Sequence, residues 1–381
     1  MIEFVLAPHE FRESIREQEP RLLKGALRGK PFSWAELDAA LHQIEPVPPV
    51  FQLFNGGIVR DDQYADIVGE LGAPRRRLNK RRFFAQLRGG ATLVVNGFEN
   101  YSLRALALCN EVRRFSGWRT AGNAYLSYGG RGTFGEHWDT HDVFAIQLIG
   151  QKRWRVYPPT FPLPLDMHTS ESSGQKCPTT PVLDCMLETG DVLYVPRGFW
   201  HHVTPTDGAS LHLSVGMYAP AVHDFVMWAC ARRLPAALAA RRSLTPPVER
   251  QALEDVLRAL GDILLSPAAR ADFEREIAST ERVRSALDTE LFLATGPEGL
   301  APSVVLRLSS ARELDPARPE VRVNGALLQL HPLPRSIIAA LGAGPLALAS
   351  LYERLESERP ETIRAAVLDL VQHEIVALER A

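Results

Sequence analysis

The feature that most constrains the fold is a series of short β-rich segments within residues 123–217, separated by glycine and proline turns. Such segments predict strands, and the gaps between them lack the helical periodicity that a parallel α/β sheet would need. Many short strands with turns of this kind are typical of a sandwich or jelly-roll barrel. The clearest segments are 124–128, 143–148, 154–157, 191–195 and 210–215.

Helical patterns flank this β-rich region, so the fold class is α+β. Residues 10–70 are helix-like with breaks, and Ser33 and Glu36 have the spacing of a capping box. After residue 220 we expect helices over 223–242, 248–265 and 268–287. From residue 301 a hairpin around Asn324-Gly325 precedes helical stretches over 334–355, with a break at 342–344, and over 361–378, an order that resembles a winged helix.

The charge balance argues against a general polyanion binder. The 381 residues carry a formal net charge of −2, whereas nucleic-acid affinity depends on excess Lys and Arg. Residues 301–381 hold nine Arg and ten acidic residues, so we expect no direct DNA binding by this segment. One segment of the chain is strongly basic: Arg75, Arg76, Arg77, Lys80, Arg81 and Arg82. We interpret this basic cluster as a solvated helix face, or alternatively as a docking surface for an acidic or RNA-rich partner.

No segment of the sequence indicates export or a membrane. The N-terminus lacks the pattern of a signal peptide, and no apolar run approaches about 18 residues. The four cysteines form no CxxC pair, which argues against a structural zinc site or a disulfide framework. We therefore expect a soluble cytoplasmic protein without contact to a membrane.

The clearest chemical motif is His137-Trp138-Asp139, just before the predicted strand at 143–148. Residues at i and i+2 of an extended segment share a face, so the imidazole and the carboxylate can point together into a barrel mouth. Downstream, a strand ends in a Pro/Gly turn that leads to His201-His202, and only one of two adjacent strand residues can face the same way. Two histidines and one carboxylate are typical of non-haem Fe(II) oxygenases.

Two further residues near this motif are candidates for the pocket. His141 shares the face of His137 and Asp139, and is either a pocket residue or a satisfied polar group. Lys152 begins the next predicted strand, and it is one of only five lysines. A keto-acid that chelates iron at one end needs a cation for its distal carboxylate, and Lys152 can provide it.

The motifs resemble those of the JmjC 2-oxoglutarate oxygenases, in particular the ribosomal oxygenase group. The resemblance rests on His137-Trp138-Asp139, on residues 142–154, and on residues 188–191 that lead to 196–201. It implies a double-stranded β-helix (cupin) JmjC catalytic domain over 1–220, a helical dimerisation region over 221–300 and a winged-helix-like domain over 301–381. A homodimer is therefore expected.

The resemblance also implies the site residues and the reaction. His137, Asp139 and His201 would hold Fe(II), and Lys152 would bind 2-oxoglutarate. Additional co-substrate or substrate contacts would come from Asn123, Tyr125 and His212. The implied enzyme uses O₂ to hydroxylate a protein side chain, an Arg or His of a ribosomal protein. Two alternatives stay open: a hydroxylase of a peptide natural product or small molecule, and a catalytically silent cupin scaffold.

Overall fold

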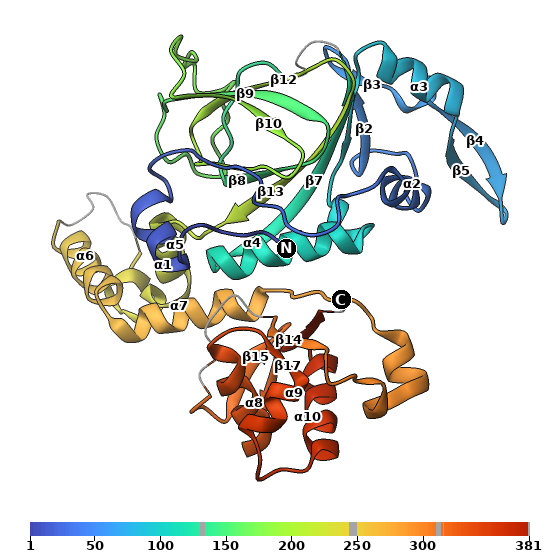
Figure 1. Ribbon diagram of the computed structural model, residues 1–381. Coiled ribbons are helices and arrows are strands. Elements are labelled where there is room, and N and C mark those ends of the chain that lie inside the picture. The colour runs from blue at the N-terminus through green and yellow to red at the C-terminus, as the bar shows by residue number, and fades with distance from the viewer. Residues whose placement is uncertain (130–133, 244–249, 310–313, 315, 380–381) are drawn as a thin grey trace. The chain divides into compact units, whose positions relative to one another are not determined.

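The computed structural model describes residues 1–129, 134–243, 250–309, 314 and 316–379. They belong to two compact units, Met1–Tyr218 and Ala219–Ala381. The first unit contains the β-rich region, and its strands form a barrel in Figure 1.

Two antiparallel sheets make up this barrel. The larger has the order β1-β11-β8-β13-β7-β6-β2-β3 and the smaller has the order β10-β9-β12. Strands that follow one another in the chain cross repeatedly between the two sheets, which confirms the predicted double-stranded β-helix. The bounds are β1 Arg21–Leu23, β2 Phe51–Phe54, β3 Ile58–Val59, β6 Thr92–Val95, β7 Arg119–Tyr128, β8 Asp142–Ile149, β9 Gln151–Tyr157, β10 Leu183–Glu188, β11 Val192–Val195, β12 Trp200–Pro205 and β13 Ala209–Tyr218.

The alternation of side chains along β7 separates the core from the barrel interior. Ala124 and Leu126 belong to the main apolar core, together with Leu108 and Val112 of helix α4 (Leu103–Ser116). Tyr125 and the other odd-numbered residues of β7 therefore point to the opposite face, toward the smaller sheet. The larger sheet therefore has one face covered by α4 and an opposite face that lines the barrel interior.

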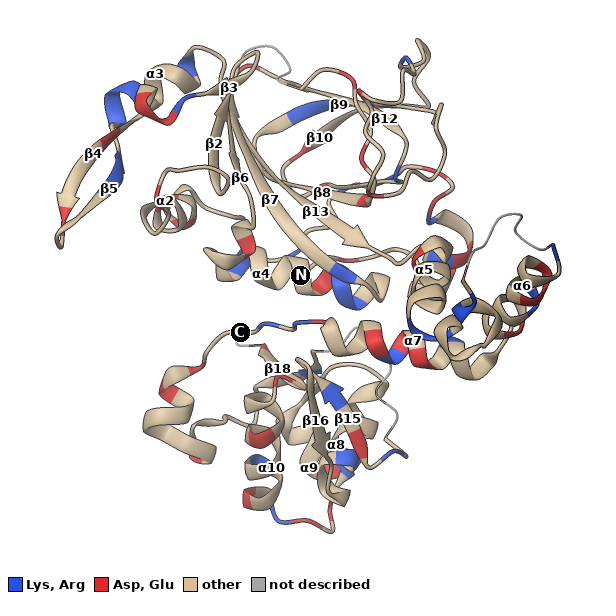
Figure 2. Ribbon diagram, turned by 180° about the vertical axis from the view of Figure 1, so that it is seen from behind, with Lys and Arg blue, Asp and Glu red and all other residues tan. Residues whose placement is uncertain are grey.

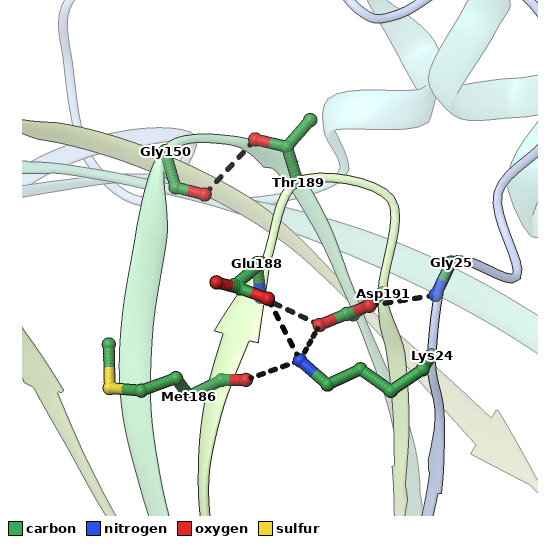
Figure 3. Close-up of polar contacts among 7 residues, drawn as sticks. All are labelled: Lys24, Gly25, Gly150, Met186, Glu188, Thr189 and Asp191. Atoms are coloured by element: carbon green, nitrogen blue, oxygen red, sulfur yellow. Dashed lines mark hydrogen bonds and ion pairs between the residues drawn. The ribbon is translucent and has the colours of Figure 1, made fainter.

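Asp191 ties the N-terminal segment to the turn before β11 (Figure 3). Its buried carboxylate accepts hydrogen bonds from Lys24 Nζ at 2.8 Å, from the Gly25 N–H at 2.8 Å and from the Glu188 N–H at 2.9 Å. Beside it, the Thr189 hydroxyl donates to the Gly150 carbonyl at 3.0 Å. The segment that begins with β1 is thereby held along the edge of the larger sheet, where β1 pairs with β11.

The helix-like interpretation of residues 10–70 is largely wrong. Only α1 (Pro8–Glu10), a π-helical turn at Phe11–Ile15 and α2 (Trp34–His42) are helical before β2, and the rest consists of strands, turns and one 3₁₀ turn at Asp61–Gln63. The capping box is confirmed, because the Ser33 side chain accepts from the Glu36 N–H and the Glu36 carboxylate accepts from the Ser33 N–H. Strands β1 and β2 form in this region because they pair with strands that lie far along the chain, β11 and β6 respectively.

The basic cluster is only partly helical, which corrects the interpretation as a helix face. Arg75, Arg76 and Arg77 lie on strand β5 (Ala73–Leu78), which pairs only with β4 (Ala65–Glu70). Lys80 begins helix α3 (Lys80–Arg88). Figure 2 shows this hairpin and helix with acidic residues among the basic ones. The three arginines form ion pairs with Glu45, Asp61 and Glu70, so the cluster is largely neutralised.

The second unit begins with helices and continues with a small mixed domain. Its helices are α5 (Val222–Arg232), α6 (Arg250–Leu264), α7 (Pro267–Thr280), α8 (Pro332–Gly342), α9 (Leu348–Arg354) and α10 (Pro360–Gln372). A sheet of order β17-β14-β18 joins Leu346–Ala347, Val305–Leu308 and Val376–Glu379, and the hairpin at Asn324 pairs β15 (Glu320–Val323) with β16 (Ala326–Gln329). No described helix is long and apolar enough to cross a lipid bilayer.

The predicted helices of this unit are present but shorter than expected. The segment 223–242 ends its α-helix at Arg232, shortly before Pro235, which cannot donate a helical hydrogen bond. The segment 268–287 ends its helix at Thr280, and 361–378 ends in strand β18 because the last residues pair with β14. The first two residues of the predicted helix 248–265 lie outside the described residues.

Candidate metal centre

The structure brings together the three residues that the HxD…H pattern predicts as ligands. One potential ligand atom each of His137, Asp139 and His201 lies within 4.8 Å of the others. The backbones of the two histidines are joined directly: His137 N–H donates to the His201 carbonyl at 3.2 Å, and His201 N–H donates back at 2.8 Å. This bridge joins the segment that precedes β8 to the start of β12.

Backbone carbonyls orient both imidazoles. His137 Nδ1 lies 3.2 Å from the Gly135 carbonyl, and His201 Nδ1 lies 3.2 Å from the Phe199 carbonyl. Because a carbonyl can only accept, each Nδ1 carries the proton, which leaves Nε2 with a free lone pair. His201 Nε2 is 3.7 Å from an Asp139 oxygen, so the free lone pairs and the carboxylate face a common point. Such outer hydrogen bonds are the usual way in which a protein fixes the tautomer of a metal-binding histidine.

The electrostatics of these side chains suit a cation. Burial lowers the pKa of His201 to about 4, which keeps this imidazole neutral. Burial also opposes ionisation of Asp139, but the three nearby imidazoles, His201 first, outweigh it and lower the pKa of this carboxyl. A neutral imidazole and an ionised carboxylate are the protonation states that a metal requires of its ligands.

A cavity of about 120 Å³ between the two sheets contains this centre. Lys152, from β9, lines it and is 3% exposed. Lys152 Nζ donates to the Tyr125 carbonyl at 3.3 Å and lies 3.0 Å from His212 Nδ1. Among the described residues no carboxylate pairs with this amine, and burial lowers the pKa of Lys152 to about 7. The cavity therefore has a buried amine without a counter-ion.

The other predicted pocket residues differ in their positions. Tyr125 and His212 face each other across the β7–β13 register, stack at 4.8 Å with an interplanar angle of 2°, and both line the cavity. Asn123 is not among the lining residues. Its side-chain oxygen accepts from the Gly97 N–H at 3.0 Å, and its side chain hydrogen-bonds the Tyr125 hydroxyl. Asn123 thus supports the pocket through Tyr125.

The two histidines next to the predicted ligands lie outside the cavity lining. His202 Nδ1 accepts from Arg155 at 2.8 Å and faces Glu136 at 3.5 Å, as expected for the neighbour of an inward-pointing strand residue. His141 stacks on Tyr218 at 4.8 Å and contributes to the electrostatic environment of Asp139. Of the interpretations for His141, the arrangement favours a packed polar group beside the site.

Nine of the residues that line the cavity were not predicted from the sequence, and three of them bear directly on the site: Ser127, Trp154 and Phe134. Ser127 follows Tyr125 at i+2 on β7, and Trp154 follows Lys152 at i+2 on β9, so period-2 alternation could have found both. Trp154 stacks on the His201 ring at 5.9 Å. Phe134 also lines the cavity, but it precedes the HxD motif in a segment without periodicity, and no pattern marked it.

The residues present fit a metal and a dicarboxylate. The donor set of two imidazole nitrogens and one carboxylate suits Fe(II). Among the described residues the Ser127 hydroxyl, 1% exposed, has no hydrogen-bond partner, and it shares the cavity with the Lys152 ammonium. A buried hydroxyl and a buried amine that both lack an anionic partner are what a bound carboxylate would satisfy.

Comparison with protein families identifies the class. Residues 96–225 match the family model described as the JmjC domain, so the chain contains a JmjC domain. This region includes all three residues of the metal centre as well as Lys152 and His212.

The curated proteins that the chain is similar to include oxygenases. The chain is 31% identical over 220 residues to ribosomal oxygenase 1 of Gallus gallus, a match that covers 56% of this chain and 35% of that protein. It is 32% identical over 159 residues to the bifunctional lysine-specific demethylase and histidyl-hydroxylase NO66 of Drosophila persimilis, which covers 41% of this chain and 22% of that protein. The chain thus matches about a third or less of these relatives' lengths.

A solved structure has the same fold along the whole chain. The ribosomal oxygenase YcfD of Escherichia coli aligns with a TM-score of 0.58 at 22% identity, over 99% of each chain. YcfD has also been solved in complex with cobalt and 2-oxoglutarate. At this identity the likeness shows the fold, and it confirms the predicted α+β class.

Proposed function

We propose that this protein is an Fe(II)- and 2-oxoglutarate-dependent oxygenase that hydroxylates a side chain of a ribosomal protein. The observation that carries the proposal is the convergence of His137, Asp139 and His201 in one cavity with the buried amine of Lys152, which has no carboxylate partner among the described residues. The match to the JmjC domain and the cobalt and 2-oxoglutarate in YcfD support the same chemistry. The intact ligand set and the buried lysine speak against a catalytically silent scaffold.

Each residue has a distinct task in this proposal. His137, Asp139 and His201 would hold the metal, and iron with 2-oxoglutarate would supply the oxidation of an unactivated C–H by O₂. Lys152, with the Ser127 hydroxyl in the same cavity, would bind the distal carboxylate of 2-oxoglutarate. Trp154 and Val143 contribute apolar surface to the cavity lining.

The proposed substrate follows from the relatives. The names of these relatives include ribosomal oxygenase and histidyl-hydroxylase, which supports a ribosomal protein and a His as the target, while Arg is the second target that the motif resemblance implies. A ribosomal substrate would place the enzyme in the cytoplasm. Hydroxylation of a peptide natural product or small molecule is the competing reaction, and an assay on ribosomes distinguishes the two.

We also propose the three-part organisation that the resemblance implies: a catalytic domain over 1–220, a dimerisation region over 221–300 and a winged-helix-like domain over 301–381. Support for a dimer comes from α6, which has no buried residue and exposes Leu253 and Leu257 on one face. A winged-helix-like domain with a net charge of −1 is unsuited to DNA, so we propose that it is a protein-contact or structural module.

Iron-dependent conversion of 2-oxoglutarate to succinate tests the reaction. Wild-type protein with Fe(II) should form succinate, and His137→Ala should abolish it because one of three ligands is lost. His202→Ala is the matched control, since this histidine faces Arg155 outside the cavity, and it should keep most of the activity. Full turnover in His137→Ala, or none in the wild type, would contradict the proposal.

Mass spectrometry of ribosomes tests the substrate. Ribosomes from a strain that lacks the gene should gain a hydroxyl group on a ribosomal protein when incubated with enzyme, Fe(II) and 2-oxoglutarate. An identical set of marks before and after incubation, while succinate still forms, would count against a ribosomal target and favour the small-molecule alternative.

A further inference from the structure

Phe134 lies at the entrance of the metal cavity. It is 44% exposed, and of the described residues that line the cavity it is the only exposed one. Lys152 is 3% exposed and Ser127 is 1% exposed, so they lie at the closed end. The cavity therefore has a polar, buried end suited to the co-substrate and an aromatic entrance.

Other rings hold the Phe134 ring beside the metal centre. Its centroid lies 4.9 Å from that of Phe54, at the end of β2, and 6.1 Å from that of Tyr125 in an edge-on arrangement. The centroid of the His137 ring is 6.3 Å away. Phe134 belongs to none of the described apolar core clusters, so these contacts fix its position without burying it in the core.

The chemistry of this ring selects for a kind of side chain. An aromatic face attracts flat, delocalised groups by stacking and attracts cations through its quadrupole. Phe134 is the exposed residue of the described cavity lining, so a side chain that enters from solvent beside it contacts its ring. Guanidinium and imidazole groups are flat, and both can stack on this ring, whereas a branched aliphatic side chain cannot.

We propose that Phe134, braced by Phe54, is a specificity-determining residue that packs against the flat side chain of the substrate, arginine or histidine, and directs it to the metal centre. This inference rests on the proposed function and extends it from the reaction to substrate recognition. In this inference Phe134 contacts the substrate, and other residues bind the metal and the co-substrate.

Paramagnetic relaxation measures this contact without turnover. The protein is loaded with Mn²⁺ in place of iron, and the relaxation of side-chain protons is recorded for Nα-acetyl-arginine amide, Nα-acetyl-histidine amide and Nα-acetyl-leucine amide. Wild-type protein should enhance the relaxation of the arginine or the histidine compound far more than that of the leucine compound. Phe134→Leu, which keeps an apolar side chain and removes the ring, should reduce that enhancement about 2- to 12-fold.

Matched variants separate a substrate contact from general effects. Phe134→Tyr keeps the ring and should retain the enhancement. Phe84→Leu removes a phenylalanine that is 46% exposed on α3 outside the cavity, and it should behave as the wild type. Affinity for 2-oxoglutarate should be the same in all four proteins.

Three results would overturn the inference: equal enhancement in Phe134→Leu and wild type, no preference for the flat side chains in the wild type, or weakened 2-oxoglutarate binding in Phe134→Leu. Failure of the proposed function would be seen elsewhere, as absence of Mn²⁺ binding or of succinate formation by the wild-type enzyme.

Discussion

Lys152 is the residue whose environment makes the sharpest prediction about pH. Its amine is buried with only neutral partners, the Tyr125 carbonyl and His212 Nδ1, and burial lowers its pKa to about 7. A dianionic co-substrate binds the protonated amine, which is present below this pKa and is lost as the pH rises through it. Affinity for 2-oxoglutarate, measured by calorimetry, should therefore weaken as the pH rises from about 7 to 8.5, and binding at high pH should take up a proton.

A neutral replacement should remove both the affinity and its pH dependence. Lys152→Met leaves the co-substrate carboxylate buried without a cation, a cost of about 2 kcal/mol or more, which corresponds to a dissociation constant at least about 30-fold higher. Lys176→Met changes an exposed lysine and serves as the control. A dissociation constant in Lys152→Met that equals that of the wild type would show that the carboxylate binds elsewhere.

The sequence predicted individual site residues where a short-range rule applied. The i and i+2 rule placed His137 and Asp139 together, and strand alternation explained why His202 lies outside the lining. Asn123 was expected to line the pocket, but it contacts the pocket only through the Tyr125 hydroxyl. Strand alternation predicts which face of the sheet a side chain is on, but it does not predict whether that side chain reaches the cavity. Phe134 could not be found, since its position depends on ring contacts with Phe54 and Tyr125 across the fold.

At the scale of elements, the Asp191 carboxylate holds the turn between β10 and β11 to the N-terminal segment. Asp191→Ala removes the acceptor for two backbone N–H groups and for Lys24 Nζ. Leaving one buried donor unsatisfied costs about 1–3 kcal/mol, so the free energy of unfolding should fall by at least that amount in a urea titration. Glu188→Ala removes only a 60% exposed partner of Lys24 and should cost less than about 1 kcal/mol. Equal losses in both variants would contradict this account.

The elements that the sequence predicted correctly are those whose pattern is local. The strands β7, β8, β9, β11 and β13 and the hairpin at Asn324 carry β-rich residues between turn residues. The N-terminal strands were missed because β1 and β2 are 3 and 4 residues long and form by pairing with distant strands. Strand β18 was missed for the same reason, since its partner β14 lies some seventy residues earlier.

At the scale of the whole molecule, oligomeric state depends on the proposed dimerisation region. The helix α6 exposes Leu253 at 49% and Leu257 at 66% on one face. Apolar side chains spaced four residues apart on a helix are commonly covered by a partner. Light scattering should give the mass of a dimer for the wild type and a shift toward the monomer for Leu253→Glu/Leu257→Glu. A strictly monomeric wild type would refute the proposal of a dimer.

The central claim is that His137, Asp139 and His201 form a metal centre, and Mn²⁺ binding to the metal-free protein tests it most directly. Electron paramagnetic resonance should show tight binding by the wild type and by His202→Ala. In His201→Ala the affinity for Mn²⁺ should fall by more than about 100-fold. Losing a hydrogen bond to a metal ligand already lowers metal affinity by about 10- to 100-fold, and losing the ligand itself should lower it further. Binding by His201→Ala as tight as that of the wild type would contradict the claim.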